Sequence, residues 1–299
     1  MTDSHEPIWA YSMYRQDVPD GYLLVVIGGM HGNELSGANY LNQYVDERIK
    51  AREGVIRRFD LRECTDAPLG RMYGIPHSPI NMLAIPIFSS IAAKNGQREE
   101  LGKDNNRQFV HFTDKSTPLG VRHLMVLLRA IRAQREPPEV VVLDYHNGSG
   151  RYEHGTGMGW AVYGERVMCD AISRQIPRWK CGSAGTAFRE GPRGSLRQYC
   201  TNILKVQYLL AEVPASDTVD DTNKQEEYAK LILDEVVKYL VGIVEAKNNS
   251  SECLKLQSRT RSSTAYWAPG RRVAWCAPPY RLPRARPMTA TTTTTEGRG

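Results

Sequence analysis

The sequence lacks several features that identify common classes of protein. Its six cysteines are scattered without a CxxC pair, which argues against a structural zinc knuckle or a disulfide framework, and we expect reduced thiols. The longest apolar runs are the length of a strand and fall far short of the roughly 20 residues that cross a bilayer. Residues 1–14 lack the basic start and apolar run of an export signal. We therefore expect a cytoplasmic protein with no membrane partner.

An excess of positive charge is lacking in most of the chain, although the net charge of the whole chain is +6. Beyond residue 247, nine Lys and Arg residues stand against two acids, a net of +7, which leaves residues 1–247 near −1. This last segment is rich in Ser, Arg, Pro and Thr and has too few clustered aliphatic residues to build a core. We expect residues 1–247 to form the folded domain and residues 248–299 a basic, disordered tail. Nucleic acid is not expected to bind the body, and binding by the tail stays open.

Strand-like apolar runs alternate with helical patterns through residues 1–247. Strands made of uninterrupted apolar residues and separated by helices are typical of a mostly parallel sheet covered by helices on both faces. The sequence therefore predicts an α/β fold of three layers, α/β/α, with a mostly parallel, mixed and twisted sheet. The predicted strands are 23–27, 83–88, 140–144, 159–163 and 206–213, and the predicted helices are 34–50, 121–135, 165–175, 194–202 and 223–244.

Two sets of metal-binding side chains follow predicted strands. His31 and Glu34 come after the strand at 23–27, with the glutamate expected to open a helix, and His146 follows the strand at 140–144. A catalytic zinc needs three protein ligands and one open position, and these three residues supply that number. Asp144 lies two residues before His146, so both side chains share a face of the strand, where Asp144 can orient the imidazole.

Two further features suit a hydrolytic site. Arg98 and the segment from Asp104 to Phe109 bring two arginines and amides together, which favours recognition of an acidic group. Glu212 lies near the end of the last predicted strand, where burial raises the chance of a shifted pKa and hence of a general base. Each signal alone is weak, because the same residues also occur in solvated charged segments and in glutamates that face solvent without any catalytic role.

Taken in order, these motifs resemble the zinc carboxypeptidase clan, most closely its aspartoacylase and succinylglutamate desuccinylase branch. The stretch VIGGMHGNELSGA carries the closest similarity, DNNRQF looks like the branch's DLNRxF, and DYHNG looks like its DLHN. All of them lie in the family's order between Tyr22 and Val213. The resemblance implies a zinc exopeptidase-like fold and one zinc ion per chain.

The resemblance also implies a role for each matching residue. His31, Glu34 and His146 would be the zinc ligands, Glu212 the general base and then acid, and Arg98 the group that polarises the scissile carbonyl. The residues that would contact the substrate are Asn106 and Arg107, which would hold its free carboxylate, and Tyr199, which could match a substrate-side tyrosine.

Three features depart from the family pattern. Asn105 stands where a leucine is usual, and Lys205 is the only cation between Tyr199 and Glu212, so Arg193 or Arg197 would have to replace an arginine of the aspartoacylases. No sizeable C-terminal β-domain is evident. We therefore expect a zinc hydrolase that cleaves an amide bond adjacent to a carboxylate, with a small acidic substrate.

The alternatives concern the substrate and the tail. An N-acyl amino acid fits the deacylase branch, whereas a metallocarboxypeptidase would act on peptide C-termini. A different class of function is an interaction module that works through the basic tail. The sequence leaves open whether the chain forms a homo-oligomer.

Overall fold

The computed structural model describes residues 6–63, 81–110, 114–134, 137–148, 161–164, 166–175, 180–181, 192–214 and 222–262. Its contacts divide the chain into two compact units, residues 1–242 and 243–299. Within these described ranges, no helix is both long and apolar enough to span a bilayer.

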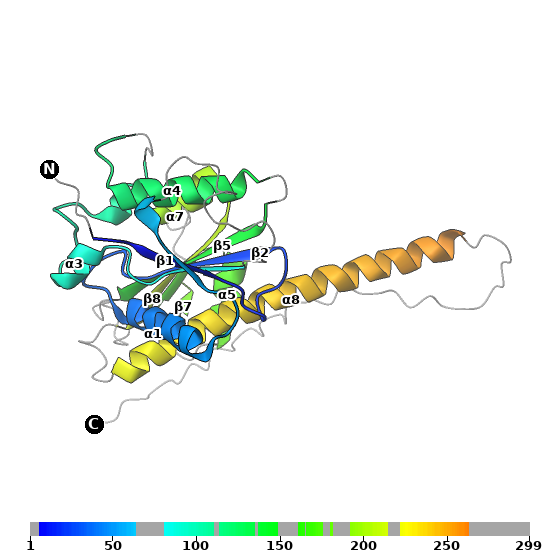
Figure 1. Ribbon diagram of the computed structural model, residues 1–299. Helices are drawn as coiled ribbons and strands as arrows, with labels where there is room; N and C mark the ends of the chain where they lie inside the picture. The colour runs from blue at the N-terminus through cyan, green and yellow to red at the C-terminus, as the bar shows by residue number, and fades with distance from the viewer. Residues whose placement is uncertain are drawn as a thin grey trace, which may run out of the picture. The chain divides into compact units, whose positions relative to one another are not determined.

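The described strands form one eight-stranded mixed sheet in the order β3-β1-β4-β2-β5-β8-β6-β7 (Figure 1). Strands β4, β2, β5 and β8 are parallel neighbours at its centre, whereas β1 and β6 add antiparallel pairings toward the edges. Every residue of β2 is buried, as expected for a parallel strand covered on both faces. The strands are β1 Trp9–Met13, β2 Tyr22–Ile27, β3 Arg57–Asp60, β4 Met82–Ile85, β5 Glu139–Gly148, β6 Ala161–Gly164, β7 Lys180–Cys181 and β8 Gln207–Pro214.

Helices cover both faces of this sheet (Figure 1). On one face lie α1 (Ser36–Ala51) and the part of α8 (Thr222–Ser262) up to Gly242, and the Tyr145 hydroxyl donates to the Ala229 carbonyl of α8 at 2.6 Å. On the other face lie α4 (Leu119–Arg132), the short α7 (Leu196–Gln198) and the π-helical turn η3 (Tyr199–Leu204). The predicted three-layer α/β/α fold with a mixed sheet is therefore confirmed.

One apolar core lies between the sheet and α4. Alternate residues of β2 and β5 enter it and meet the apolar stripe of α4, which includes Leu124 and Leu128. The remaining short elements are η1 (Leu61–Glu63), α3 (Ser90–Lys94), η2 (Asn105–Arg107) and α5 (Arg166–Gln175).

The structure corrects several predicted boundaries. The first helix begins at Ser36 rather than Glu34, so Glu34 lies in the turn before it, with its N–H bonded to the His31 carbonyl at 3.1 Å. The strand predicted at 83–88 ends at Ile85. The last helix runs to Ser262, so residues 248–262, predicted to be disordered, are helical, and the rest of the predicted tail lies outside the described residues.

Candidate metal centre

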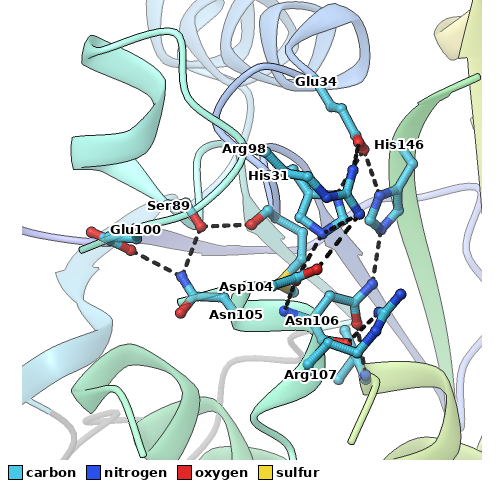
Figure 2. A network of polar contacts seen from close by, with 12 residues as sticks. His31, Glu34, Ser89, Arg98, Glu100, Asp104, Asn105, Asn106, Arg107 and His146 are labelled. Atoms are coloured by element: carbon cyan, nitrogen blue, oxygen red, sulfur yellow. Dashed lines mark hydrogen bonds and ion pairs between the residues drawn. The ribbon is translucent and has the colours of Figure 1, made fainter. Parts of the chain in front are cut away.

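Three side chains converge where β2 and β5 end at the same edge of the sheet. His31 and Glu34 follow β2 in the loop before α1, and His146 lies on β5 (Figure 2). The Nδ1 atom of His31 lies 3.0 Å from Glu34 Oε2, and the Nδ1 atom of His146 lies 2.7 Å from the same oxygen. One ligand atom from each of the three residues lies within 4.8 Å of the others. This spacing suits coordination of a single metal ion.

Glycines allow the loop between β2 and α1 to pass close to its neighbours. A Cβ atom added at Gly28 would lie 2.6 Å from the Pro86 carbonyl oxygen, and one added at Gly32 would lie 2.1 Å from the backbone of Ala92. Gly29 has a φ of +57°, in the left-handed region that favours glycine. The GGMHG sequence therefore places His31 by close packing against the segment before α3 and against α3 itself.

The second nitrogen of each histidine contacts a separate carboxylate. The Nε2 atom of His31 lies 3.0 Å from Asp104 Oδ1, and the Nε2 atom of His146 lies 3.2 Å from Asp144 Oδ2. The Nε2 atom of His31 also lies 3.0 Å from Arg98 Nη2. A histidine that donates from Nε2 to its carboxylate has its Nδ1 lone pair available for a metal. The buried Nδ1 of His31 has no hydrogen-bond partner among the described residues. This is the arrangement in which proteins hold metal-ligating imidazoles.

The electrostatics of the cluster favour a cation. Burial by itself lowers the pKa of His146, but the charges of Asp144 and Glu34 outweigh it and raise the pKa well above its ordinary value. Burial likewise opposes ionisation of Glu34, yet contacts with His146 and His31 bring its pKa far below the usual range. The site therefore stabilises positive charge between its ligand atoms, where a divalent ion can take the place of protons.

Glu212 lies directly beside His146 in the parallel ladder of β5 and β8. Residues paired in this way present their side chains on the same face of the sheet. Burial raises the pKa of Glu212, with the carboxylates of Glu34 and Asp144 acting in the same direction and the two histidines opposing it. Such a carboxylate suits a group that accepts and later returns a proton.

Arg98 lies across the two ligands that follow β2 (Figure 2). Its Nη1 donates to Glu34 Oε1 at 2.6 Å, and its Nη2 lies 3.6 Å from Asp104 Oδ2. The Arg98 side chain is 45% exposed.

Asn106 and Arg107 occupy the η2 turn below the histidines in Figure 2. The Nδ2 atom of Asn106 lies 3.5 Å from His146 Nε2, and its Oδ1 accepts from the Leu196 N–H at 2.9 Å. Arg107 is exposed, and its Nη1 donates to the Asn106 carbonyl. Asn106 is therefore a buried support of the cluster, whereas Arg107 is the residue of this pair that solvent can reach.

Asp104, Asn105 and Asn147 were given no role from the sequence. Asn105 donates to Ser89 Oγ at 2.8 Å, and that hydroxyl donates to the carbonyl of Met30, the residue before His31. The Oδ1 atom of Asn147 accepts from the Ser36 N–H at the start of α1. The signal that could have found these residues is their place in the DNNR and DYHN motifs, directly beside predicted site residues. Their polar side chains connect the segments that carry the site.

The structure corrects the role expected for Tyr199. Its side chain is fully buried in the core between the sheet and α4, where the hydroxyl accepts from Arg129 Nε at 2.8 Å and donates to the Met125 carbonyl at 3.1 Å. Tyr199 therefore faces α4 and is not available to a substrate. Arg197 is buried and Arg193 is exposed.

Comparisons with known proteins give similarity of backbone only. No protein-family model matches the chain, and no curated protein matches it in sequence. A candidate metallopeptidase from Shewanella denitrificans OS217 is 16% identical with a TM-score of 0.48, over 77% of this chain and 78% of that one. Tripeptide-bound cell shape determinant Csd4 of Helicobacter pylori is 16% identical with a TM-score of 0.49, over 79% of this chain and 55% of that one. The ectoine utilization protein EutE (DoeB) of Ruegeria pomeroyi is 13% identical with a TM-score of 0.45, over 73% of this chain and 57% of that one.

Proposed function

We propose that this protein is a zinc-dependent hydrolase that cleaves an amide bond adjacent to a carboxylate, as in the deacylation of N-acyl amino acids. The observation that carries the proposal is the convergence of His31 Nδ1, His146 Nδ1 and a Glu34 oxygen, with a carboxylate on the far nitrogen of each histidine. Two imidazoles and one carboxylate are a ligand set of catalytic zinc sites, which keep a further position open. The order of the HGNE, DNNR and DYHN motifs supports the same class.

A zinc ion held by His31, Glu34 and His146 would supply Lewis-acid polarisation of a carbonyl and greater acidity of water. Glu212 would accept a proton from the attacking water and return it to the leaving amine, a role that suits a carboxylate with a raised pKa. Arg98, with its guanidinium partly exposed beside Glu34, would donate hydrogen bonds to the carbonyl oxygen as negative charge develops there.

The carboxylate of the substrate would be held by Arg107 together with Asn106. Arg107 is exposed in the turn that also contacts the histidines, and its planar fork suits bidentate binding of a carboxylate. Holding the substrate at this second point would orient the scissile amide toward Glu212.

The test combines metal content with a panel of substrates. Purified protein would be analysed for bound metal and for hydrolysis of N-acetyl and N-succinyl amino acids and of dipeptides. We expect about one zinc per chain and turnover of the N-acyl amino acids, and the Glu212→Gln variant should keep its zinc while its kcat falls by roughly 10²-fold to 10⁴-fold.

Glu227→Gln on α8 makes the same chemical change at an exposed position and serves as the matched control. It should retain the kcat of the wild type. Full activity in the Glu212→Gln variant, or a protein that takes up no divalent metal, would refute the proposal. Preferential hydrolysis of dipeptides would instead favour the metallocarboxypeptidase alternative, which differs in substrate size rather than chemistry.

A further inference from the structure

We infer that Tyr208, a fully buried residue of β8, is a positioning residue for the metal centre and acts on His146 through Asp144. The inference rests on the metal site of the proposed function. Figure 2 shows His146 between Glu34 and Asn106. Tyr208 lies on the neighbouring strand β8, opposite Val142 of β5.

The sheet register aligns these side chains. In the parallel ladder of β5 and β8, Val142 pairs with Tyr208, Asp144 with Leu210, and His146 with Glu212. Residues two apart on a strand share a face, so Tyr208, Asp144 and His146 all point to the face covered by α4. Tyr208 is a diagonal neighbour of Asp144, within reach of a long aromatic side chain.

Asp144 is a buried carboxylate with few donors. Its side chain is 0% exposed, and its Oδ2 atom accepts from the Tyr208 hydroxyl at 2.6 Å while lying 3.2 Å from His146 Nε2. Its other oxygen, Oδ1, makes no hydrogen bond to any described residue. A desolvated carboxylate depends strongly on each of its remaining hydrogen bonds. The shorter of the two contacts, from the phenol, therefore holds the carboxylate in the orientation that His146 requires.

The direction of this hydrogen bond is defined. Burial and the negative charge of Asp144 raise the pKa of Tyr208 well above its ordinary value, so the phenol keeps its proton and donates it. When His146 donates from Nε2 to Asp144, its Nδ1, which lies 2.7 Å from Glu34 Oε2, is the nitrogen left to bind a metal. Outer partners of this kind typically change metal affinity by tenfold to a hundredfold when they are removed.

The test measures zinc affinity by competition with a chromophoric chelator, in the full chain. Tyr208→Phe removes only the hydroxyl and should weaken zinc binding by about tenfold to a hundredfold. Tyr199→Phe is the matched control, because Tyr199 is equally buried in the same core and its hydroxyl bonds only to α4 groups among the described residues. We expect this variant to bind zinc within about twofold of the wild type, since its hydroxyl has no contact with the metal ligands.

A double-mutant cycle provides an independent measurement. If Tyr208 acts through Asp144, then Tyr208→Phe should alter zinc affinity by less than about twofold once Asp144→Asn is present. The absorption spectrum of the cobalt-loaded protein should also change in Tyr208→Phe and not in Tyr199→Phe.

The outcomes separate this inference from the proposed function. Tight zinc binding by the wild type with unchanged affinity in Tyr208→Phe would overturn the inference alone. Equal losses in the two phenylalanine variants would show a general effect of core packing and would also overturn it. A wild-type protein that binds no zinc would overturn the proposed function and this inference together.

Discussion

Asp104 and His31 form one half of a symmetric pair of contacts, with Asp104 Oδ1 lying 3.0 Å from His31 Nε2. Asp144 makes the equivalent contact with His146 from within the same strand, β5, whereas Asp104 lies just before η2. Each carboxylate therefore contacts the Nε2 atom of one imidazole, although the two come from separate parts of the chain. Contacts with His31 overcome the effect of burial and lower the pKa of Asp104 to about 2, so it is ionised at neutral pH.

The first prediction concerns Asp104→Asn. The amide keeps the size of the side chain but removes the charge that orients His31, so zinc should bind about tenfold to a hundredfold more weakly. Chelator competition would measure the affinity. Asp46→Asn on the exposed side of α1 is the control and should bind zinc as the wild type does. Unchanged affinity in Asp104→Asn would exclude a role for this carboxylate at the metal.

The second prediction concerns Arg98→Ala, which, unlike Asp104→Asn, should not weaken zinc binding. Arg98 donates to Glu34 and places a positive charge beside the ligands, so its removal should leave zinc affinity unchanged or increase it. The same change should lower kcat by roughly 10²-fold to 10³-fold, because a donor to the developing oxyanion is lost. Affinity and kinetics measured on the same preparation test this. A large loss of zinc would assign Arg98 to metal binding instead.

The third prediction concerns glycines in two helices. Gly37 of α1 lies against Tyr145, and an added Cβ would lie 2.3 Å from the tyrosine Cβ, so Gly37→Ala should lower the free energy of unfolding by about 1–3 kcal/mol. Gly242 of α8 has nothing within 4 Å of an added Cβ, so Gly242→Ala should raise it by about 0.5–1 kcal/mol. Chemical denaturation would measure both values. Equal effects of the two substitutions would contradict the packing of α1 on the sheet.

The fourth prediction concerns the stability of the protein in acid. Burial opposes ionisation of Asp60, but hydrogen bonds from Arg62 and the Ile8 N–H lower its pKa below the ordinary 3.8. A carboxylate with a lowered pKa stabilises the folded state above its unfolded pKa, and that contribution is lost as the pH falls through the folded pKa. Asp60→Asn should therefore lower the free energy of unfolding by about 1–2 kcal/mol at pH 7. The difference between the wild type and the variant should shrink progressively below pH 4, as Asp60 becomes protonated. Unfolding curves between pH 3 and pH 7 would measure the difference.

The convergence of His31 and His146 was accessible from the sequence for a definite physical reason. Both follow apolar runs typical of buried parallel strands, and the carboxyl ends of such strands meet at one edge of a sheet. Strand β1 and the edge strand β3 beside it were missed, because segments such as Arg57–Asp60 are short and polar and lack the apolar run that marks a buried strand.

Contacts between distant loops could not be predicted in the same way. The link from Asn105 through Ser89 to the Met30 carbonyl joins three segments whose approach depends on close packing around Gly32. Tyr199 was misassigned because its position near Glu212 in the sequence says nothing of which side of its helical turn faces α4. The π-helical geometry of η3 was also not predicted, because no periodicity in the sequence indicates it.

The residues of the candidate centre arise at the ends of three adjacent strands, β2, β5 and β8. Neighbouring strands are held about 4.8 Å apart by their backbone hydrogen bonds, a spacing that side-chain chemistry does not alter. His146 and Glu212 therefore cannot separate unless the ladder between β5 and β8 breaks. His31 and Glu34, in contrast, lie in the loop between β2 and α1. One side of the site is thus tied to the sheet itself, and the other side depends on how that loop packs.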